Sequence, residues 1–87
     1  MATVHIMAPL RVLTGGESEV VVSGATLGEI VDDLERRFPG IKSRLVQGDR
    51  LRPGLAVFVN GVNAPSWLST RTPAEAEIYF APAISGG

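Results

Sequence analysis

A single amphipathic helix pattern stands between two sets of strand patterns in this 87-residue chain, and few folds accommodate that order. Residues 26–29 read Thr-Leu-Gly-Glu, a capping box in which the Thr26 hydroxyl accepts the Glu29 amide and the Glu29 carboxylate reaches the Thr26 amide. Apolar residues then recur at the spacing of one helical face, at Leu27, Ile30, Val31, Leu34 and Phe38. Pro39-Gly40 is predicted to end the helix. The hydrated face is predicted to contain Asp32, Asp33, Glu35, Arg36 and Arg37.

Alternating or β-branched stretches on both sides of the helix predict the strands. They lie at residues 2–8, 19–23, 56–60, 62–64 and 77–81. Gly15-Gly16 is predicted to form a turn after the first strand, and Asn60-Gly61 is a strong signal for a hairpin turn.

The order ββαββ predicts one α+β domain, a β-grasp (ubiquitin-like) fold over residues 1–83 with a mixed sheet of four to five strands and the main helix on one face. Residues 41–46 are predicted to add a short helical turn, and residues 48–54 a polar loop. The first and last strands are expected to be parallel neighbours at the sheet centre, which places the loop containing Arg11 beside the root of the C-terminal tail. The tail, residues 84–87, is expected to be flexible.

The composition argues against several classes of function. Eight scattered Lys and Arg against nine Asp and Glu give a net charge of −1, which argues against nucleic-acid binding. The absence of cysteine excludes disulfides, thiolate metal sites and a cysteine nucleophile. His5, the one histidine, is expected on the outer face of the sheet and not in a metal site or catalytic triad. No apolar run approaches the ~20 residues of a membrane span and no signal-peptide pattern is present, so we expect a cytoplasmic protein without membrane contact.

The remaining candidate for chemistry is the C-terminal Gly86-Gly87. The reference pKa of an α-carboxyl group is about 3.3–3.7, so the Gly87 carboxylate is ionised at neutral pH and is a nucleophile toward the α-phosphate of ATP. Glycine has no Cβ, so an extended Gly-Gly segment can pass through a narrow slot to a partner's nucleotide. From Ala83 to Gly87 the chain spans at most about 17 Å, which suffices to enter a neighbouring active site. Gly87 is therefore predicted to react, and Ile84, Ser85 and Gly86 to contact the partner.

The sheet face opposite the helix is a second candidate surface. If Val4, Val57 and Ile78 face the helix, alternation places on the open face His5, Met7, Phe58, Tyr79 and Ala81. Methionine and aromatic side chains on an open face are typical of protein docking, so Met7, Phe58 and Tyr79 are predicted to bind a partner. The alternative is that this face is covered by loops that carry Leu51, Leu55 and Trp67.

Several short motifs follow one another along nearly the whole chain. They are Leu10-Arg11-x-x-Thr14-Gly15-Gly16, Thr26-Leu27-Gly28, Asp33-Leu34, Gly40-Ile41-x-x-Arg44-Leu45, Val59-Asn60 and Pro82-x-x-x-Gly86-Gly87. In this order and spacing they resemble the MoaD/ThiS family of sulfur carriers. The Leu-Arg-x-x-Thr-Gly-Gly turn and the Pro-Ala-x-x-Gly-Gly ending are most similar to the CysO branch, which serves cysteine biosynthesis.

The resemblance implies a covalent carrier that is not itself an enzyme and binds no cofactor. An E1-like adenylyltransferase of the MoeB/ThiF type would use ATP and Mg²⁺ to adenylate the terminal glycine, and a sulfur donor or sulfurtransferase would convert it to a thiocarboxylate. The acceptor is a PLP-dependent cysteine synthase in the CysO branch and the thiazole-forming enzyme of thiamin biosynthesis in the ThiS branch. In the MoaD branch the carrier is the small subunit of molybdopterin synthase and serves the large subunit. By position, Gly87 is the acyl site, Gly86 the tunnel residue, and Arg11 matches an arginine often found at that turn.

Two departures from the family pattern weaken an assignment to molybdopterin synthase. Ala74-Glu75-Ala76 stands where many relatives have Asp-Gly-Asp, so this turn must be built differently, and Ala83 replaces the second proline of many MoaD endings. Two other functions stay open. One is a ubiquitin-like modifier conjugated to lysines through Gly87, and the other is a β-grasp interaction module with an inert tail.

Overall fold

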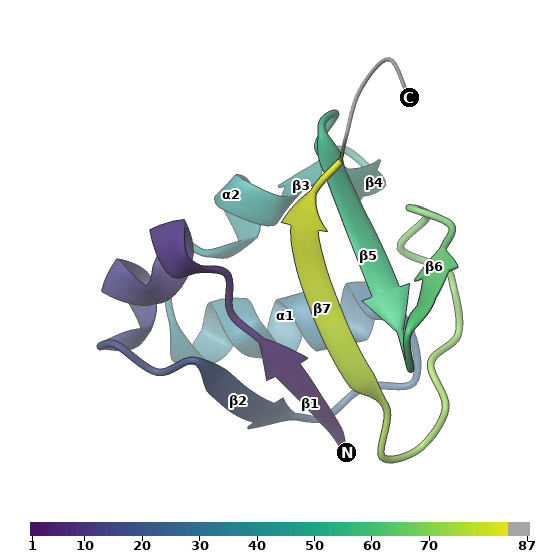
Figure 1. Ribbon diagram of the computed structural model, residues 1–87, viewed down its shortest axis with the longest axis horizontal. Coiled ribbons are helices and arrows are strands. Elements are labelled where there is room, and N and C mark those ends of the chain that lie inside the picture. The colour runs from purple at the N-terminus through teal and green to yellow at the C-terminus, as the bar shows by residue number, and fades with distance from the viewer. Residues whose placement is uncertain (84–87) are drawn as a thin grey trace.

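The computed structural model describes residues 1–83 and contains a five-stranded mixed sheet with one long helix, α1 (Leu27–Arg37), across one face (Figure 1). The strands are β1 (Ala2–His5), β2 (Glu19–Val22), β5 (Leu55–Val59), β6 (Val62–Ala64) and β7 (Glu77–Pro82). Their order across the sheet is β2-β1-β7-β5-β6. One main helix therefore covers one face of a mixed sheet, as the sequence predicts.

The first and last strands, β1 and β7, run parallel and side by side at the centre of the sheet. Val4 pairs with Ile78 and His5 with Tyr79, while β5 pairs antiparallel with the other side of β7 (Figure 1). Parallel neighbours end at the same edge of a sheet. The connection that follows β1 therefore starts at the edge where β7 ends, which confirms the predicted arrangement.

The core lies between α1 and the side chains that alternate onto the inner face of the sheet. Val4, Val57 and Ile78 are fully buried from the sheet, and Ile30 and Leu34 are fully buried from the helix. This confirms the predicted parity of the strands. At such positions, truncation of an Ile or Leu side chain to Ala costs about 2–5 kcal/mol of stability.

The helix begins at the predicted N-cap with one difference in the capping box. The Thr26 Oγ1 accepts the Glu29 amide at 3.2 Å, as predicted. The Glu29 Oε1 accepts the amide of Ala25 at 2.9 Å instead of that of Thr26. At the other end the helix stops at Arg37, and Gly40 has a φ of +102°, a conformation that a residue with Cβ rarely adopts.

Asp33 was predicted on the hydrated face of the helix, and that prediction is wrong. The residue is only 6% exposed, because its carboxylate faces the end of β2 and accepts the Ser23 amide at 3.0 Å. Arg36 and Arg37 pair with the same carboxylate from the following turn of the helix, Arg37 at 3.5 Å. A buried carboxylate needs such partners, and here they join the helix to the sheet edge.

The connection after β1 differs from the predicted strand over residues 2–8. Pairing of β1 stops at His5, and the chain turns into the 3₁₀ helix η1 (Ala8–Thr14). Pro9 stands in the first turn of η1, where a fixed φ is favourable and no amide is needed. The predicted Gly15-Gly16 turn is present, with φ values of +66° and +90°.

The segment between α1 and β5 contains more structure than predicted. The expected helical turn is α2 (Lys42–Leu45), and it is followed by β3 (Val46–Gln47) and β4 (Arg50–Leu51), which form a two-stranded ribbon. Residues 48–54 were predicted as a polar loop without a strand. Leu51 is only 2% exposed, so its burial in the core explains why the ribbon forms.

The turn before β7 is built around Glu75, which has a positive φ of 59°. Its amide donates to the Met1 carbonyl at 2.7 Å, and its carboxylate lies 3.7 Å from the N-terminal amine. These contacts show how Ala74-Glu75-Ala76 forms a turn without the glycine that many relatives have. None of the helices in residues 1–83 is long and apolar enough to cross a membrane.

Candidate functional site

The root of the C-terminal tail is fixed by the edge of the sheet. Pro82, the last residue of β7, pairs with Leu55 of β5. The Ala83 amide donates to the Gly54 carbonyl at 2.7 Å. The predicted reactive residue Gly87 and the predicted partner-binding residues Ile84, Ser85 and Gly86, together with the predicted flexibility of the tail, lie outside the described residues. The structure thus defines the point from which the tail departs.

A row of polar and aromatic side chains crosses the outer face of the sheet. The strand register aligns Glu19, His5, Tyr79, Phe58 and Asn63 on successive strands from β2 to β6. Tyr79 is 45% exposed, and His5 and Phe58 are half-buried. We call His5, Tyr79 and Phe58 the aromatic row. Two of the three predicted docking residues, Phe58 and Tyr79, are therefore neighbours on adjacent strands.

Glu77 holds part of the aromatic row in place, and the sequence interpretation missed it. The His5 and Tyr79 rings stack with centroids 3.9 Å apart and planes only 2° from parallel. On the same face, the Glu77 Oε1 lies 2.6 Å from the His5 Nε2. The sequence does indicate that Glu77 and Tyr79 share a face of the sheet, since they are two residues apart on one strand. The contact between Glu77 and His5 depends in addition on the parallel register of β1 and β7, which brings His5 beside these two residues.

Met7, the third predicted docking residue, lies outside the paired strand. It follows His5 where the chain has left β1, and its half-buried side chain packs against the core. It lines a hollow of about 290 Å³ together with His5, Arg11 and Tyr79. Met7 was predicted to share the open face of the sheet as part of the first strand; instead it belongs to the connection after β1 and borders the aromatic row from there. Its role in partner binding stays a prediction.

Arg11 is anchored on η1 at the rim of the same hollow. Its Nε donates to the Ile6 carbonyl at 3.0 Å. Its own carbonyl accepts the Gly16 amide at 2.8 Å and the Thr14 hydroxyl at 3.2 Å. Arg11 is exposed. The parallel arrangement of β1 and β7 thus brings this arginine into one surface hollow with Tyr79 and Phe80, near the end of β7.

The loops proposed as a possible cover for the outer face have other contacts. Leu51 is buried in the core, and Leu55 lies within β5. The Trp67 ring lies against Arg50, whose Cζ is 4.6 Å from the ring centroid. Within residues 1–83 these three side chains therefore do not cover the aromatic row, in agreement with the exposure of Tyr79.

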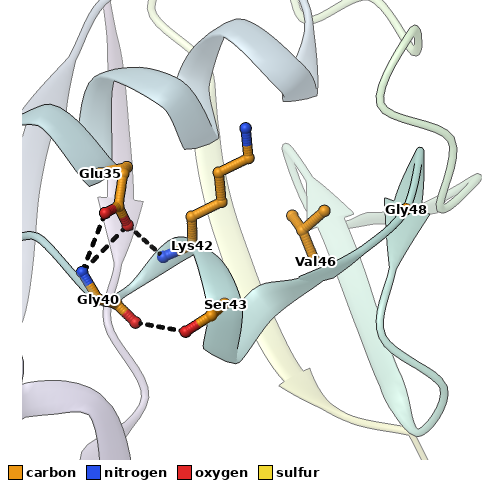
Figure 2. A pocket seen from close by; sticks show the side chains of 6 residues that line it. All are labelled: Glu35, Gly40, Lys42, Ser43, Val46 and Gly48. Carbon is orange, nitrogen blue, oxygen red and sulfur yellow. Dashed lines mark hydrogen bonds between the residues drawn. The ribbon is translucent and has the colours of Figure 1, made fainter.

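A separate hollow of about 420 Å³ lies where α1 meets α2, and Figure 2 shows that its polar groups bind one another. The Glu35 Oε1 accepts the amides of Lys42 at 2.8 Å and Gly40 at 3.1 Å, and the Ser43 hydroxyl donates to the Gly40 carbonyl at 3.0 Å. The bonds from the Lys42 and Gly40 amides lower the pKa of Glu35. These contacts join the two helices, so we assign the hollow a structural role.

The part of the chain that the structure describes offers no metal centre. Within residues 1–83, no group of three or more His, Asp or Glu side chains is placed to hold a metal ion. The candidate site comprises the tail root, Arg11 and the aromatic row.

Known proteins with a similar sequence or fold define the family. The ThiS family model matches residues 4–87. The sulfur carrier protein CysO of Mycobacterium tuberculosis is 36% identical, and the alignment covers 98% of this chain and 97% of that protein. A chain of the Amycolatopsis orientalis BexX/CysO complex is 38% identical, with a TM-score of 0.89 and complete coverage of both chains. SAMP1 of Haloferax volcanii is 31% identical over 99% of this chain and 98% of that one, with a TM-score of 0.71.

These similarities confirm the β-grasp fold and the resemblance that the motifs indicated. The curated relatives are named as sulfur carriers and not as enzymes, which supports a carrier role. Since both the family model and the CysO sequences extend over almost the entire chain, the protein belongs to the ThiS family.

Proposed function

We propose that the protein carries sulfur as a thiocarboxylate on Gly87, for use in biosynthesis. The observation that carries the proposal is that the tail follows directly from the central strand β7, whose residues Tyr79 and Phe80 line one hollow with Arg11. The full-length similarity to CysO sulfur carriers supports it. A partner that binds this edge would receive the tail while the globular body stays outside its active site.

The chemistry takes place on the terminal carboxylate in two steps. In the first, a Gly87 carboxylate oxygen attacks the α-phosphate of ATP in an E1-like adenylyltransferase with Mg²⁺, and pyrophosphate leaves. In the second, sulfide from a sulfur donor attacks the acyl carbon, and AMP leaves with the bonding electron pair. Adenylation is required because a free carboxylate resists nucleophilic attack until one oxygen becomes part of a good leaving group.

We assign recognition of the activating enzyme to the aromatic row and Arg11. Tyr79 and Phe58 pair on the outer face of the sheet, and Phe58 lines a hollow together with Pro82 and Ala83 at the tail root. Arg11 gives a charged donor at the rim of the hollow that Tyr79 lines. Aromatic and arginine side chains are enriched among the residues that contribute most to protein interfaces. Met7, Ile84, Ser85 and Gly86 complete the predicted contact surface.

The CysO relatives favour cysteine biosynthesis as the destination of the sulfur. The acceptor would then be a PLP-dependent cysteine synthase in the cytoplasm, in preference to the large subunit of molybdopterin synthase. The A. orientalis relative was crystallised in a complex, which supports function through partner proteins. The second candidate function is protein modification, since SAMP1, a small archaeal modifier protein, is 31% identical and has a similar fold.

Intact-mass analysis tests the proposal. With an E1-like enzyme of this family, ATP, Mg²⁺ and a sulfide source, the protein should gain about 16 Da, the replacement of one oxygen by sulfur at the activated carboxyl. Tandem mass spectrometry should place the change at Gly87. Conjugates to lysine without any thiocarboxylate would favour the modifier. An unchanged mass after adenylation by a demonstrably active enzyme would contradict the carrier proposal.

A further inference from the structure

The segment of residues 42–52 has a charge opposite to that of the whole chain. Its one acid is Asp49, and its basic residues are Lys42, Arg44, Arg50 and Arg52, whereas the chain has one more acidic than basic residue. Lys42 is paired, since its Nζ lies 2.7 Å from Asp32. Between described residues no ion pair involves Arg44, Arg50 or Arg52, and all three are exposed.

The exposed Trp67 adjoins one of these arginines, Arg50. Its side chain is 48% exposed, and the Arg50 guanidinium lies over its ring. The loop that carries it is fixed to β4 by a backbone bridge between Arg50 and Trp67 and by a 3.0 Å bond from the Leu51 amide to the Ser66 carbonyl. A guanidinium stacked on an indole keeps its N–H groups free at the edge to bind a carboxylate.

Arg52 connects this surface to the root of the tail. Its Nη1 donates to the Ser43 carbonyl at 3.3 Å, which directs the side chain toward α2. Its carbonyl accepts the Leu55 amide at 3.1 Å and so closes the turn that contains Gly54. The Gly54 carbonyl in turn holds the Ala83 amide. We call Arg44, Arg50, Arg52 and Trp67 the arginine–tryptophan surface.

We propose that the arginine–tryptophan surface binds an acidic segment of a partner protein, separately from the aromatic row. Guanidinium groups bind carboxylates through two parallel hydrogen bonds, and three arginines that pair with no carboxylate of residues 1–83 favour an occupant rich in Asp or Glu. Complementary charge of this kind raises the rate of association and selects among partners. Because the surface adjoins the turn that holds Ala83, a bound partner lies next to the departing tail. The carrier and the modifier alike would use such contact.

Trp67 is the only tryptophan in the chain, so its fluorescence reports on this surface alone. The probe is a twelve-residue synthetic peptide of alternating Glu and Ala, compared with a Lys and Ala peptide of the same length. The Glu peptide should change the Trp67 emission to saturation, with a Kd that rises as NaCl is added, and the Lys peptide should leave the emission unchanged. An absent response, or an equal response to both peptides, would overturn the proposal.

Single variants separate this surface from a general effect of net charge. Arg52→Gln should raise the Kd of the Glu peptide roughly tenfold, because a charge-assisted bidentate bond is lost. The matched control is Arg36→Gln on α1, which removes the same charge from an exposed arginine and leaves Arg37 paired with Asp33. The control should change the Kd less than about twofold. Equal losses in the two variants would refute the proposal.

The same titration is independent of sulfur chemistry, since it contains no ATP, activating enzyme or sulfide. Arg50→Lys provides a further test, because it retains the charge and loses the planar group that stacks on Trp67. The Kd of the Glu peptide should be higher for Arg50→Lys than for the unchanged protein. Equal Kd values would limit the role of Arg50 to its charge and contradict the assigned stacking geometry.

Discussion

At the level of single residues, Glu77 helps to hold the His5 and Tyr79 rings in a fixed arrangement. An exposed tyrosine normally samples several rotamers, and ordering it on binding costs conformational entropy. Here the His5 ring stacks on the Tyr79 ring. The Glu77 carboxylate lies 2.6 Å from the Nε2 of His5. The His5 and Tyr79 rings are therefore pre-organised for a partner before contact is made.

The variant Tyr79→Glu tests the role of this row. It should raise the Kd for the activating enzyme about tenfold or more, because a carboxylate would be desolvated at the centre of the interface. Stability should fall by less than about 1 kcal/mol, since Tyr79 is 45% exposed. Isothermal titration calorimetry and urea unfolding give the two quantities. Val21→Glu, at an equally exposed position on the edge strand β2, is the matched control and should leave the Kd unchanged.

Arg11 permits a kinetic prediction. The variant Arg11→Ala should raise KM for the carrier in adenylation more than it lowers kcat, because the residue lies at the rim of the docking hollow and not at the reacting carboxylate. Steady-state pyrophosphate release measures both constants. A kcat that falls as strongly as kcat/KM, with KM unchanged, would instead place Arg11 in the chemical step.

At the level of secondary-structure elements, α1 depends on its N-cap. The variant Thr26→Ala removes the acceptor of the Glu29 amide and should lower the free energy of unfolding by about 1 kcal/mol. Urea denaturation measures it. Ser69→Ala, a change of a hydroxyl in the exposed loop before β7, serves as the control and should stay within about 0.5 kcal/mol of the unchanged protein.

Glu35 gives the junction of α1 and α2 a dependence on pH. Because the amides of Lys42 and Gly40 lower its pKa in the folded state below the ordinary value of 4.5, the ionised form stabilises the fold. This contribution is present above pH 4.5 and is lost as pH falls through the folded-state pKa. The stability difference between the protein and Glu35→Gln should therefore shrink on acidification, measured by urea unfolding at several pH values. A difference that grows toward low pH would contradict the assignment.

Elements with local signals were predictable from the sequence, and those fixed by distant contacts were not. The capping box and the apolar stripe of α1 lie within one segment, so the helix was placed correctly. The burial of Asp33 depends on the Ser23 amide ten residues earlier in the chain. The ribbon of β3 and β4 depends on Leu51, whose burial in the core no local pattern indicates. The pairing of Glu77 with His5 spans 72 residues and follows only from the parallel register.

At the level of the whole molecule, the parallel pairing of β1 and β7 assembles the candidate site. It brings the first connection, with Arg11, to the edge toward which β7 runs. The end of β7 from which the tail starts is paired with β5 through Pro82, and the Ala83 amide is bonded to the Gly54 carbonyl, so movement of the root is restricted when a partner binds the tail. A loose root would let the carboxylate vary in position, and adenylation requires the reacting atoms within about 3–3.5 Å.

Tail length is therefore the property that most directly tests this architecture. Deletion of Gly87 should abolish adenylation, because the tail would end one residue, ~3.5 Å, short of the α-phosphate while its root stays fixed. Gly87→Ala keeps the length and adds a Cβ, so it should slow adenylation without abolishing it. Pyrophosphate release by the cognate enzyme measures both, and unchanged thermal unfolding confirms an intact domain. Activation of the shortened protein at the normal rate would contradict the carrier function and favour an interaction module with an inert tail.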